Sequence, residues 1–148
     1  MNTYLRALLL LFFVLPGAAF SASLSDLTGM VKSGAPSLSG LLSSQLGVNQ
    51  DQAEGGVGSI LSLAKEKLKS ADYSKVAESI PGAQGYVDKA KNLGAVTGKL
   101  KNLQGLNKAL GKLGMSPETV AKFTPTVIEY AGKLGGTKTQ ALLSSVIK

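Results

Sequence analysis

The sequence contains no histidine and no cysteine. This excludes serine–histidine–aspartate and cysteine–histidine nucleophilic sites, zinc sites built from those side chains, and disulfides, so the fold must be stabilised by packing. Carboxylate pairs are the remaining acid–base option. The nine acidic residues are scattered, however, and usually lie beside lysines, as Glu66 does between Lys65 and Lys67. We therefore expect a protein that is not an enzyme and that holds no metal and no cofactor.

Arginine is nearly absent as well. Arg6 is the only one, and lysine supplies the rest of the positive charge in a chain of net charge +7. Arginine is the side chain suited to bidentate phosphate recognition, and aromatic rings stack on bases. After the first 20 residues the aromatics are only Tyr73, Tyr86, Phe123 and Tyr130. Nucleic acid is therefore not an expected partner.

The lysines have two interpretations. They form a solvated surface that keeps the protein soluble, or they attract anionic lipid headgroups or envelope polymers. The second interpretation predicts a basic face made of Lys89, Lys91, Lys99, Lys101, Lys108 and Lys112.

The N-terminus has the three parts of a secretory signal peptide. Arg6 supplies the positive charge, residues 7–14 are an unbroken apolar run, and a Pro-Gly pair at 16–17 precedes small residues. We place cleavage after Ser21, or one or two residues later. The alternative is an uncleaved membrane anchor, but a spanning helix needs about 20 apolar residues, and this stretch ends at Phe20.

The sequence thus divides into a signal peptide (1–21), a weak helix or flexible lead-in (22–35) and a helical domain (36–148). No cysteine follows the apolar run, which excludes lipoprotein processing. The predicted location is periplasmic or secreted.

Apolar residues at three- and four-residue spacings predict helices throughout the domain. The first runs from Pro36 to Gly47. The best helix start is Asn49, an N-cap with Gln52 at the capping-box position and Asp51 at the positive helix end. The stripe of this second helix is Val57, Ile60, Leu61, Ala64 and Leu68. A short helix from residue 71 ends at a Pro-Gly pair at 81–82.

Residues 84–113 form a long lysine-rich stretch whose apolar stripe runs from Leu93 to Leu113. Glycine lowers helix stability by about 1 kcal/mol relative to alanine, so we expect breaks or mobility near Gly94 and Gly105. Residues 94–99 resemble a phosphate-binding loop. The spacing of their glycines is one residue short, and no Ser or Thr follows Lys99.

Ser116 and Pro117 predict another strong helix start. Pro125 is expected to kink or split this helix because proline lacks the amide hydrogen. A Gly-Gly pair at 135–136 is expected to end it, and Thr137 to cap a last helix. Since no segment alternates with period two, the predicted fold is all-α, a single small bundle of five to seven helices.

Three glycines, Gly55, Gly56 and Gly58, lie inside the best-capped helix, where glycine is unfavourable. The interpretation we favour is close approach of another helix over these small residues. The alternative is an exposed interaction surface or a ligand contact at the backbone.

Two stretches carry a family resemblance: LGVNQDQAEGGVGSILSLAKEKL at 46–68 and LGMSPETVAKFTPTVIEYAGKLGG at 113–136. Together with the Asp72-Tyr73 pair and residues 80–82, they resemble the exported bacterial family of unknown function VcgC/VcgE. The resemblance implies a helical exported domain. It implies no established activity, so it assigns no catalytic residue.

The function predicted from the sequence is a non-enzymatic binding or protein-interaction module with an unknown protein partner. The partner would contact either the stripe from Leu93 to Leu113 or the surface of Gly55, Gly56 and Gly58. The alternative is a basic amphipathic protein that associates with anionic membrane or envelope polymers. A third hypothesis, a hydrolase built on carboxylates, predicts a concave pocket holding two close acidic side chains.

Overall fold

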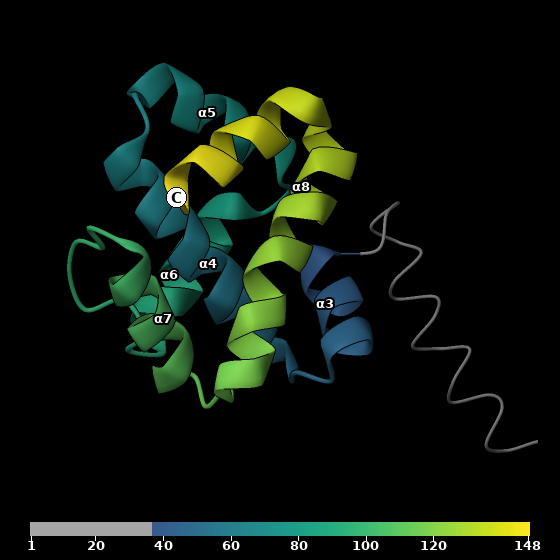
Figure 1. Ribbon diagram of the computed structural model, residues 1–148, viewed down its shortest axis with the longest axis vertical. Coiled ribbons are helices and arrows are strands. Elements are labelled where there is room, and N and C mark those ends of the chain that lie inside the picture. Colours follow the sequence, from purple (N-terminus) through teal and green to yellow (C-terminus); the bar gives the residue numbers. More distant parts are fainter. Residues whose placement is uncertain (1–36) are drawn as a thin grey trace, which may run out of the picture. The chain divides into compact units, whose positions relative to one another are not determined.

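The computed structural model describes residues 37–148, and every regular element in that range is an α-helix (Figure 1). The predicted signal peptide and lead-in lie outside the described residues. The all-α prediction is confirmed. The six helices of the described range are α3 (Leu38–Leu46), α4 (Gln50–Lys67), α5 (Ser70–Ser79), α6 (Ala83–Asn92), α7 (Leu103–Lys112) and α8 (Pro117–Val146). None of the helices within residues 37–148 combines the length and the apolar character needed to cross a bilayer.

The predicted helix starts are formed by local hydrogen bonds. At α4 the Asn49 side chain accepts from the amide of Gln52 at 2.8 Å, and the Gln52 side chain accepts from the amide of Asn49 at 3.0 Å. This is the predicted capping box. At α8 the Ser116 hydroxyl accepts from the amide of Thr119, and Pro117 occupies the first turn. Both starts are confirmed.

Helix α4 is the centre of the unit, because it packs against each of the other five described helices. Residues 55–64 are buried without interruption, so this part of α4 is enclosed on all sides. The predicted stripe residues Val57, Ile60, Leu61 and Ala64 are buried as expected, and burial extends beyond the stripe to the other faces of this part of α4. Ser59 and Ser62 are buried within this run because their hydroxyls donate to the carbonyls of Gly55 and Gly58, both at 2.8 Å.

The long lysine-rich stretch is divided into α6 and α7 by a loop at residues 93–102. The break near Gly94 is confirmed: φ is +71° there, in the left-handed region that glycine adopts readily. The break expected near Gly105 is wrong. Gly105 lies inside α7, where its amide donates to the side chain of the N-cap Asn102 at 2.9 Å.

Helix α8 is interrupted at Gly136, within the Gly-Gly pair where its end is predicted, whereas Pro125 does not split it. The φ angle of Gly136 is +80°, whereas the residues around Pro125 keep helical dihedral angles. Proline removes only one hydrogen bond, the one to the carbonyl of Ala121, and both residues are exposed. In Figure 1 the chain turns after the upper end of α8 and its last turns run back toward the C-terminus.

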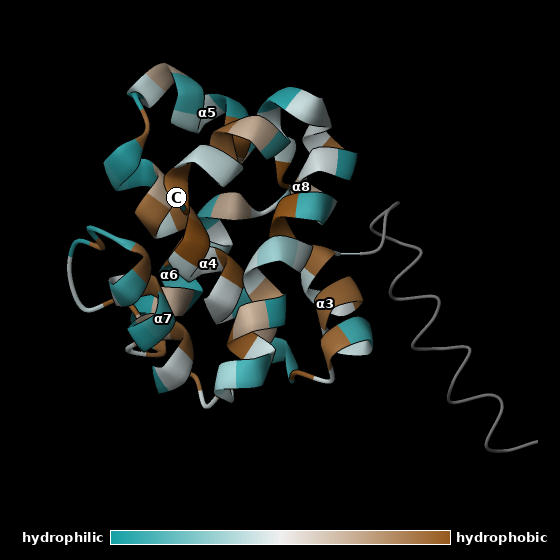
Figure 2. Cartoon of the chain, in the orientation of Figure 1, coloured by the Kyte–Doolittle hydropathy of each residue, from teal (hydrophilic) through white to brown (hydrophobic). Residues whose placement is uncertain are grey.

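The apolar core draws side chains from all six helices. Its largest fully buried members include Phe123 of α8, Leu42 of α3, Ile60 of α4 and Leu106 of α7. Figure 2 shows brown and teal bands alternating along the outer helices, as expected for helices that bury one face. Core packing therefore fixes the positions of α7 and α8, on which the candidate site depends.

Candidate functional site

The glycines of α4 lie at helix contacts inside the unit. A Cβ atom on Gly58 would overlap the backbone carbonyl of Tyr86 in α6 and would lie 2.9 Å from the Cβ of Ala90. The α4 and α6 backbones thus lie so close at Gly58 that there is no room for a larger residue at this position.

At the other two glycines, side chains from other parts of the chain occupy the space where a Cβ atom would lie. A Cβ on Gly55 would lie 2.9 Å from Leu113 and 3.0 Å from Leu93, and one on Gly56 would overlap the ring of Phe123. All three glycines are buried. They pack the chain against itself and are covered by α6, by α8 and by the ends of the 93–113 segment.

Two of the six lysines proposed as a basic face are paired with carboxylates. Lys89 lies 2.8 Å from Asp51 and 3.9 Å from Glu54, and the hydrogen bond to Asp51 raises the pKa of Lys89 above its ordinary value. Lys99 lies 3.7 Å from Glu66. Within the described residues the other four (Lys91, Lys101, Lys108 and Lys112) form no ion pair and are exposed.

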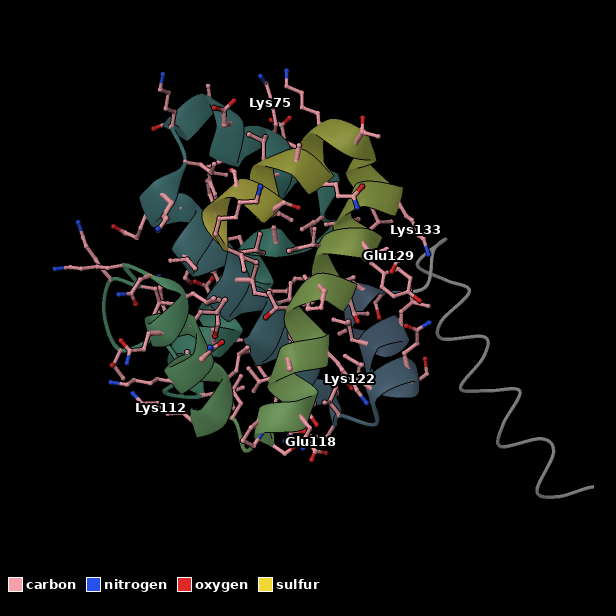
Figure 3. All side chains as sticks on the ribbon, in the orientation of Figure 1. Lys75, Lys112, Glu118, Lys122, Glu129 and Lys133 are labelled. Atoms are coloured by element: carbon pink, nitrogen blue, oxygen red, sulfur yellow. The ribbon has the colours of Figure 1, made fainter. Side chains whose placement is uncertain are left out.

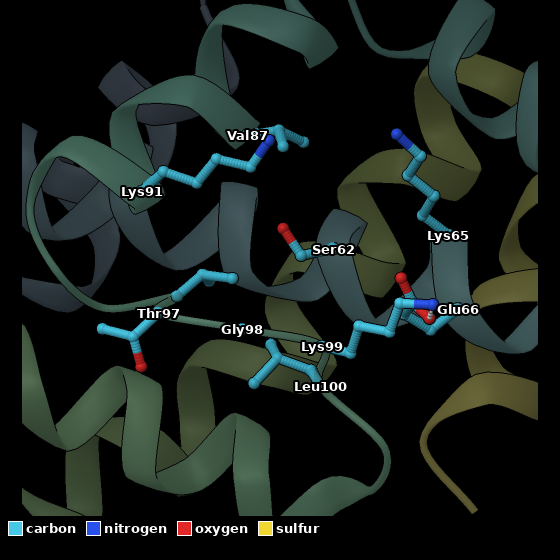
Figure 4. Close-up of a pocket in the computed structure, with 10 residues that line it drawn as sticks. Ser62, Lys65, Glu66, Val87, Lys91, Thr97, Gly98, Lys99 and Leu100 are labelled. Atoms are coloured by element: carbon cyan, nitrogen blue, oxygen red, sulfur yellow. Dashed lines mark ion pairs between the residues drawn. The ribbon is translucent and has the colours of Figure 1, made fainter.

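A hollow of about 320 Å³ bordered by charged side chains lies between α4, α6 and the 93–102 loop (Figure 4). Lys65, Lys91 and Lys99 border it from these three elements, with Glu66 as the one carboxylate in its lining. The segment that resembles a phosphate loop forms one wall. No strand precedes that segment in the described range, so it lacks the setting of a nucleotide loop. A hollow with a single acid also lacks the carboxylate pair that a hydrolase would need.

A larger and more apolar groove of about 470 Å³ lies between α7 and α8. Its volume falls in the range of small-molecule sites, about 300–1,000 Å³. From α7 it is bordered by Leu103, Asn107 and Gly111, which follow one another at four-residue spacing on one helix face. Its other described lining residues are Met115, Pro117, Val120, Ala121, Thr124, Pro125 and Ile147.

None of the described residues that line the groove carries an ionisable side chain. Leu103 at its edge keeps 38% of its surface exposed. The labelled charged side chains lie at the outside of the unit, as Lys133 and Glu129 do where they pair at 2.9 Å on α8 (Figure 3). The groove therefore exposes apolar surface bordered by uncharged groups, and this arrangement suits an uncharged apolar ligand.

Two residues of α8 that border the groove depart from the ordinary hydrogen bonding of a helix. The Thr124 side chain is only 7% exposed, and its buried hydroxyl has no hydrogen-bond partner. In a regular helix the carbonyl of Ala121 would accept from the backbone amide of residue 125, but Pro125 has no amide hydrogen. Ala121, Thr124 and Pro125 all border the groove.

Sequence reasoning did not find this groove. Leu103 and Leu113 were assigned to one continuous stripe, but they lie at opposite ends of α7, and only Leu103 borders the groove. Pro125 was the one sequence feature that pointed to this part of α8, because a proline within a helix leaves the carbonyl four residues earlier without its usual hydrogen bond. It was interpreted only as a helix break. Thr124 carries no signal of its own.

The described residues form an all-α unit with an apolar groove between α7 and α8. The chain belongs to the family described as protein of unknown function VcgC/VcgE (DUF2780), which matches residues 17–147. This confirms the resemblance noted in the sequence. No curated protein and no solved structure matches the chain.

Proposed function

We propose that the protein works outside the cytoplasm as a non-enzymatic binding module, and that it binds its ligand in the groove between α7 and α8. The observation that carries the proposal is the groove itself, whose described lining is largely apolar and includes no ionisable side chain. A ligand that covers this apolar lining removes it from water, which is favourable.

The groove supports this function better than the lysines support attachment to anionic polymers. Lys89 and Lys99 are already paired with carboxylates, and surface lysines act mainly as solvated point charges. Binding is also favoured over catalysis, because neither hollow brings two acidic side chains together within the described residues. The proposal therefore assigns the interaction surface to α7 and α8, since the glycines of α4 are buried within the unit.

Gly111→Leu is expected to block the groove while leaving the fold intact. A Cβ on Gly111 meets nothing within 4 Å, and the residue borders the groove. Leucine is also a better helix former than glycine, by up to about 1 kcal/mol. The added leucine side chain occupies apolar surface that a ligand would otherwise cover. Burial of a side chain of this size is worth about 1.5–3 kcal/mol, so a ligand that loses this contact should bind at least about tenfold more weakly. The protein is purified from cells that make it, and its affinity for the uncharged apolar dye Nile red is measured by fluorescence titration.

Gly85→Leu is the matched control. Gly85 is an exposed glycine of α6 that also has nothing within 4 Å of its Cβ position, and it does not border the groove. Its substitution should leave dye affinity unchanged and give a similar helix stabilisation. Equal dye binding by the two variants would show that the dye, and the proposed ligand with it, does not use the groove.

The proposed location depends on cleavage of the N-terminal segment. The mass of the protein recovered from the periplasm or the medium should correspond to residues 22–148, or to a chain shorter by one or two residues. Intact mass spectrometry of that fraction measures this directly. Recovery of the protein from the cytosol with residues 1–21 still attached would contradict export.

A further inference from the structure

Three lysines from three different elements border the hollow between α4, α6 and the 93–102 loop. Lys65 lies in the last turn of α4, Lys91 in the last turn of α6, and Lys99 in the loop that follows α6. Figure 4 shows the side chains of Lys65 and Lys91 extending toward each other, whereas Lys99 is directed at Glu66. The described lining thus carries three positive charges and one negative charge.

The helix ends explain each lysine separately but not their convergence on one hollow. The helix dipole favours cations in the last turn of a helix, and Lys67 and Lys89 occupy the same last turns of α4 and α6. Neither of them borders the hollow, and Lys89 is paired with carboxylates of α4. Lys65 and Lys91 form no ion pair within the described residues, so their charges at the hollow are uncompensated.

The third lysine is held only weakly by its carboxylate. The ammonium nitrogen of Lys99 lies 3.7 Å from a carboxylate oxygen of Glu66, which is too long for a good hydrogen bond, and the Lys99 side chain is 77% exposed. Exposed ion pairs contribute little to stability because water screens them. An anion that enters the hollow can therefore take the place of Glu66 beside Lys99.

We infer that this hollow binds the phosphate group of a small molecule or of a lipid headgroup, and that the ammonium groups of Lys65, Lys91 and Lys99 contact it. Lysine binds phosphate as a point charge, and a hollow lined mainly by one sign of charge concentrates its counter-ions. A phosphate monoester carries nearly two negative charges at neutral pH, whereas a carboxylate carries one. The 94–99 segment lacks the glycine spacing of a nucleotide loop, so recognition depends on the lysines. The hollow does not share lining residues with the α7–α8 groove, and this site goes beyond the proposed function.

The test measures the affinity for inorganic phosphate by ¹H–¹⁵N NMR titration at constant ionic strength, with acetate as the singly charged comparison. Phosphate should bind more tightly than acetate, with the largest shifts at residues 62–66, 87–91 and 96–100. Lys91→Gln should weaken phosphate binding about fivefold, the upper limit for one exposed charge contact. Lys108→Gln is the matched control, because Lys108 is also exposed and unpaired but does not border the hollow. Its effect should stay below about twofold, since salt screens distant charges.

Glu66→Gln provides the sharper test, because it predicts a gain. The substitution frees Lys99 and removes a charge that repels phosphate, so phosphate should bind up to about fivefold more tightly. Glu129→Gln is its control: Glu129 also pairs with a lysine, Lys133, at 2.9 Å, but it lies on α8 and does not border the hollow. An equal gain from both variants would show that only the net charge of the protein matters, which would overturn the inference.

Vesicles distinguish the two sources of the phosphate group. If the protein sediments with vesicles that contain phosphatidic acid, and Lys91→Gln but not Lys108→Gln abolishes this, the phosphate belongs to a lipid headgroup. Binding of inorganic phosphate without sedimentation assigns it to a small molecule. No shifts around the hollow at millimolar phosphate, equal affinities for phosphate and acetate, or equal losses in the two lysine variants would overturn the inference. The proposed function fails separately, when Gly111→Leu leaves Nile red binding unchanged.

Discussion

Phe123→Ala is expected to lower the free energy of unfolding by about 3–5 kcal/mol, the usual cost of removing a buried phenylalanine ring. Phe123 is fully buried, and its ring lies over Gly56 of α4. The ring occupies the space that a larger residue at position 56 would need. Urea denaturation followed by circular dichroism measures the loss.

The same contact predicts that the effects of Gly56→Ala and Phe123→Ala on the free energy of unfolding are not additive. Gly56→Ala alone should destabilise by about 1–3 kcal/mol, because its methyl group meets the Phe123 ring. In the Phe123→Ala background the same methyl group enters the cavity and improves helix propensity. Gly56→Ala should then be neutral or stabilising, a coupling of at least about 1 kcal/mol. Additive effects of the two substitutions would contradict the packing of Phe123 on Gly56.

Gly58→Ala is expected to destabilise by about 3 kcal/mol, the upper end of the usual cost of overpacking. The added methyl group would overlap the backbone carbonyl of Tyr86. A backbone atom cannot rotate away as a side chain can, so α4 and α6 must separate along a contact that includes Ala90. The shift of the urea midpoint measures the effect.

Gly85→Ala is the comparison for Gly58→Ala, because Gly85 is also a glycine within a helix, one residue before Tyr86, but it is exposed and its Cβ position is open. It should stabilise by up to about 1 kcal/mol through helix propensity alone. If both glycine variants shifted the midpoint equally, the close approach of α4 and α6 would be refuted.

Helix starts could be predicted because their signals are local. The capping box of Asn49 and Gln52 and the Ser116-Pro117 start each depend on residues within one turn. The same is true of the break at Gly94, where a positive φ favours glycine. Short-range chemistry of this kind does not depend on how the helices pack later.

Hydrophobic periodicity alone does not predict the full burial of α4. The close approach of other helices at Gly55, Gly56 and Gly58 is predicted instead from the cost of glycine inside a helix, and the burial of Ser59 and Ser62 is not predicted at all. In the structure small residues are buried because they admit neighbouring helices, and Ser59 and Ser62 satisfy their hydroxyls within α4. Hydrophobic periodicity reflects the polarity of side chains. It does not show that small side chains are also buried, because they allow close packing of helices.

The groove escaped prediction for a different reason. It is bordered by Leu103 and Gly111 of α7 and by Ala121 and Thr124 of α8, and its shape depends on how these two helices pack. Sequence patterns predict helices but not the space between them. Similarly, the pairing of Lys89 with Asp51 joins α6 to α4, so it depends on helix packing and is not predicted from lysine positions.

The most direct test of the groove as the binding surface is site-specific photo-crosslinking in the cells that make the protein. Benzoylphenylalanine replaces Leu103, which borders the groove, or Leu134, which does not; these leucines are 38% and 42% exposed. The account predicts a crosslinked partner protein from position 103 but not from 134, and its loss when Gly111→Leu is added. The same product from both positions, a product that survives Gly111→Leu, or no product from position 103 would contradict it.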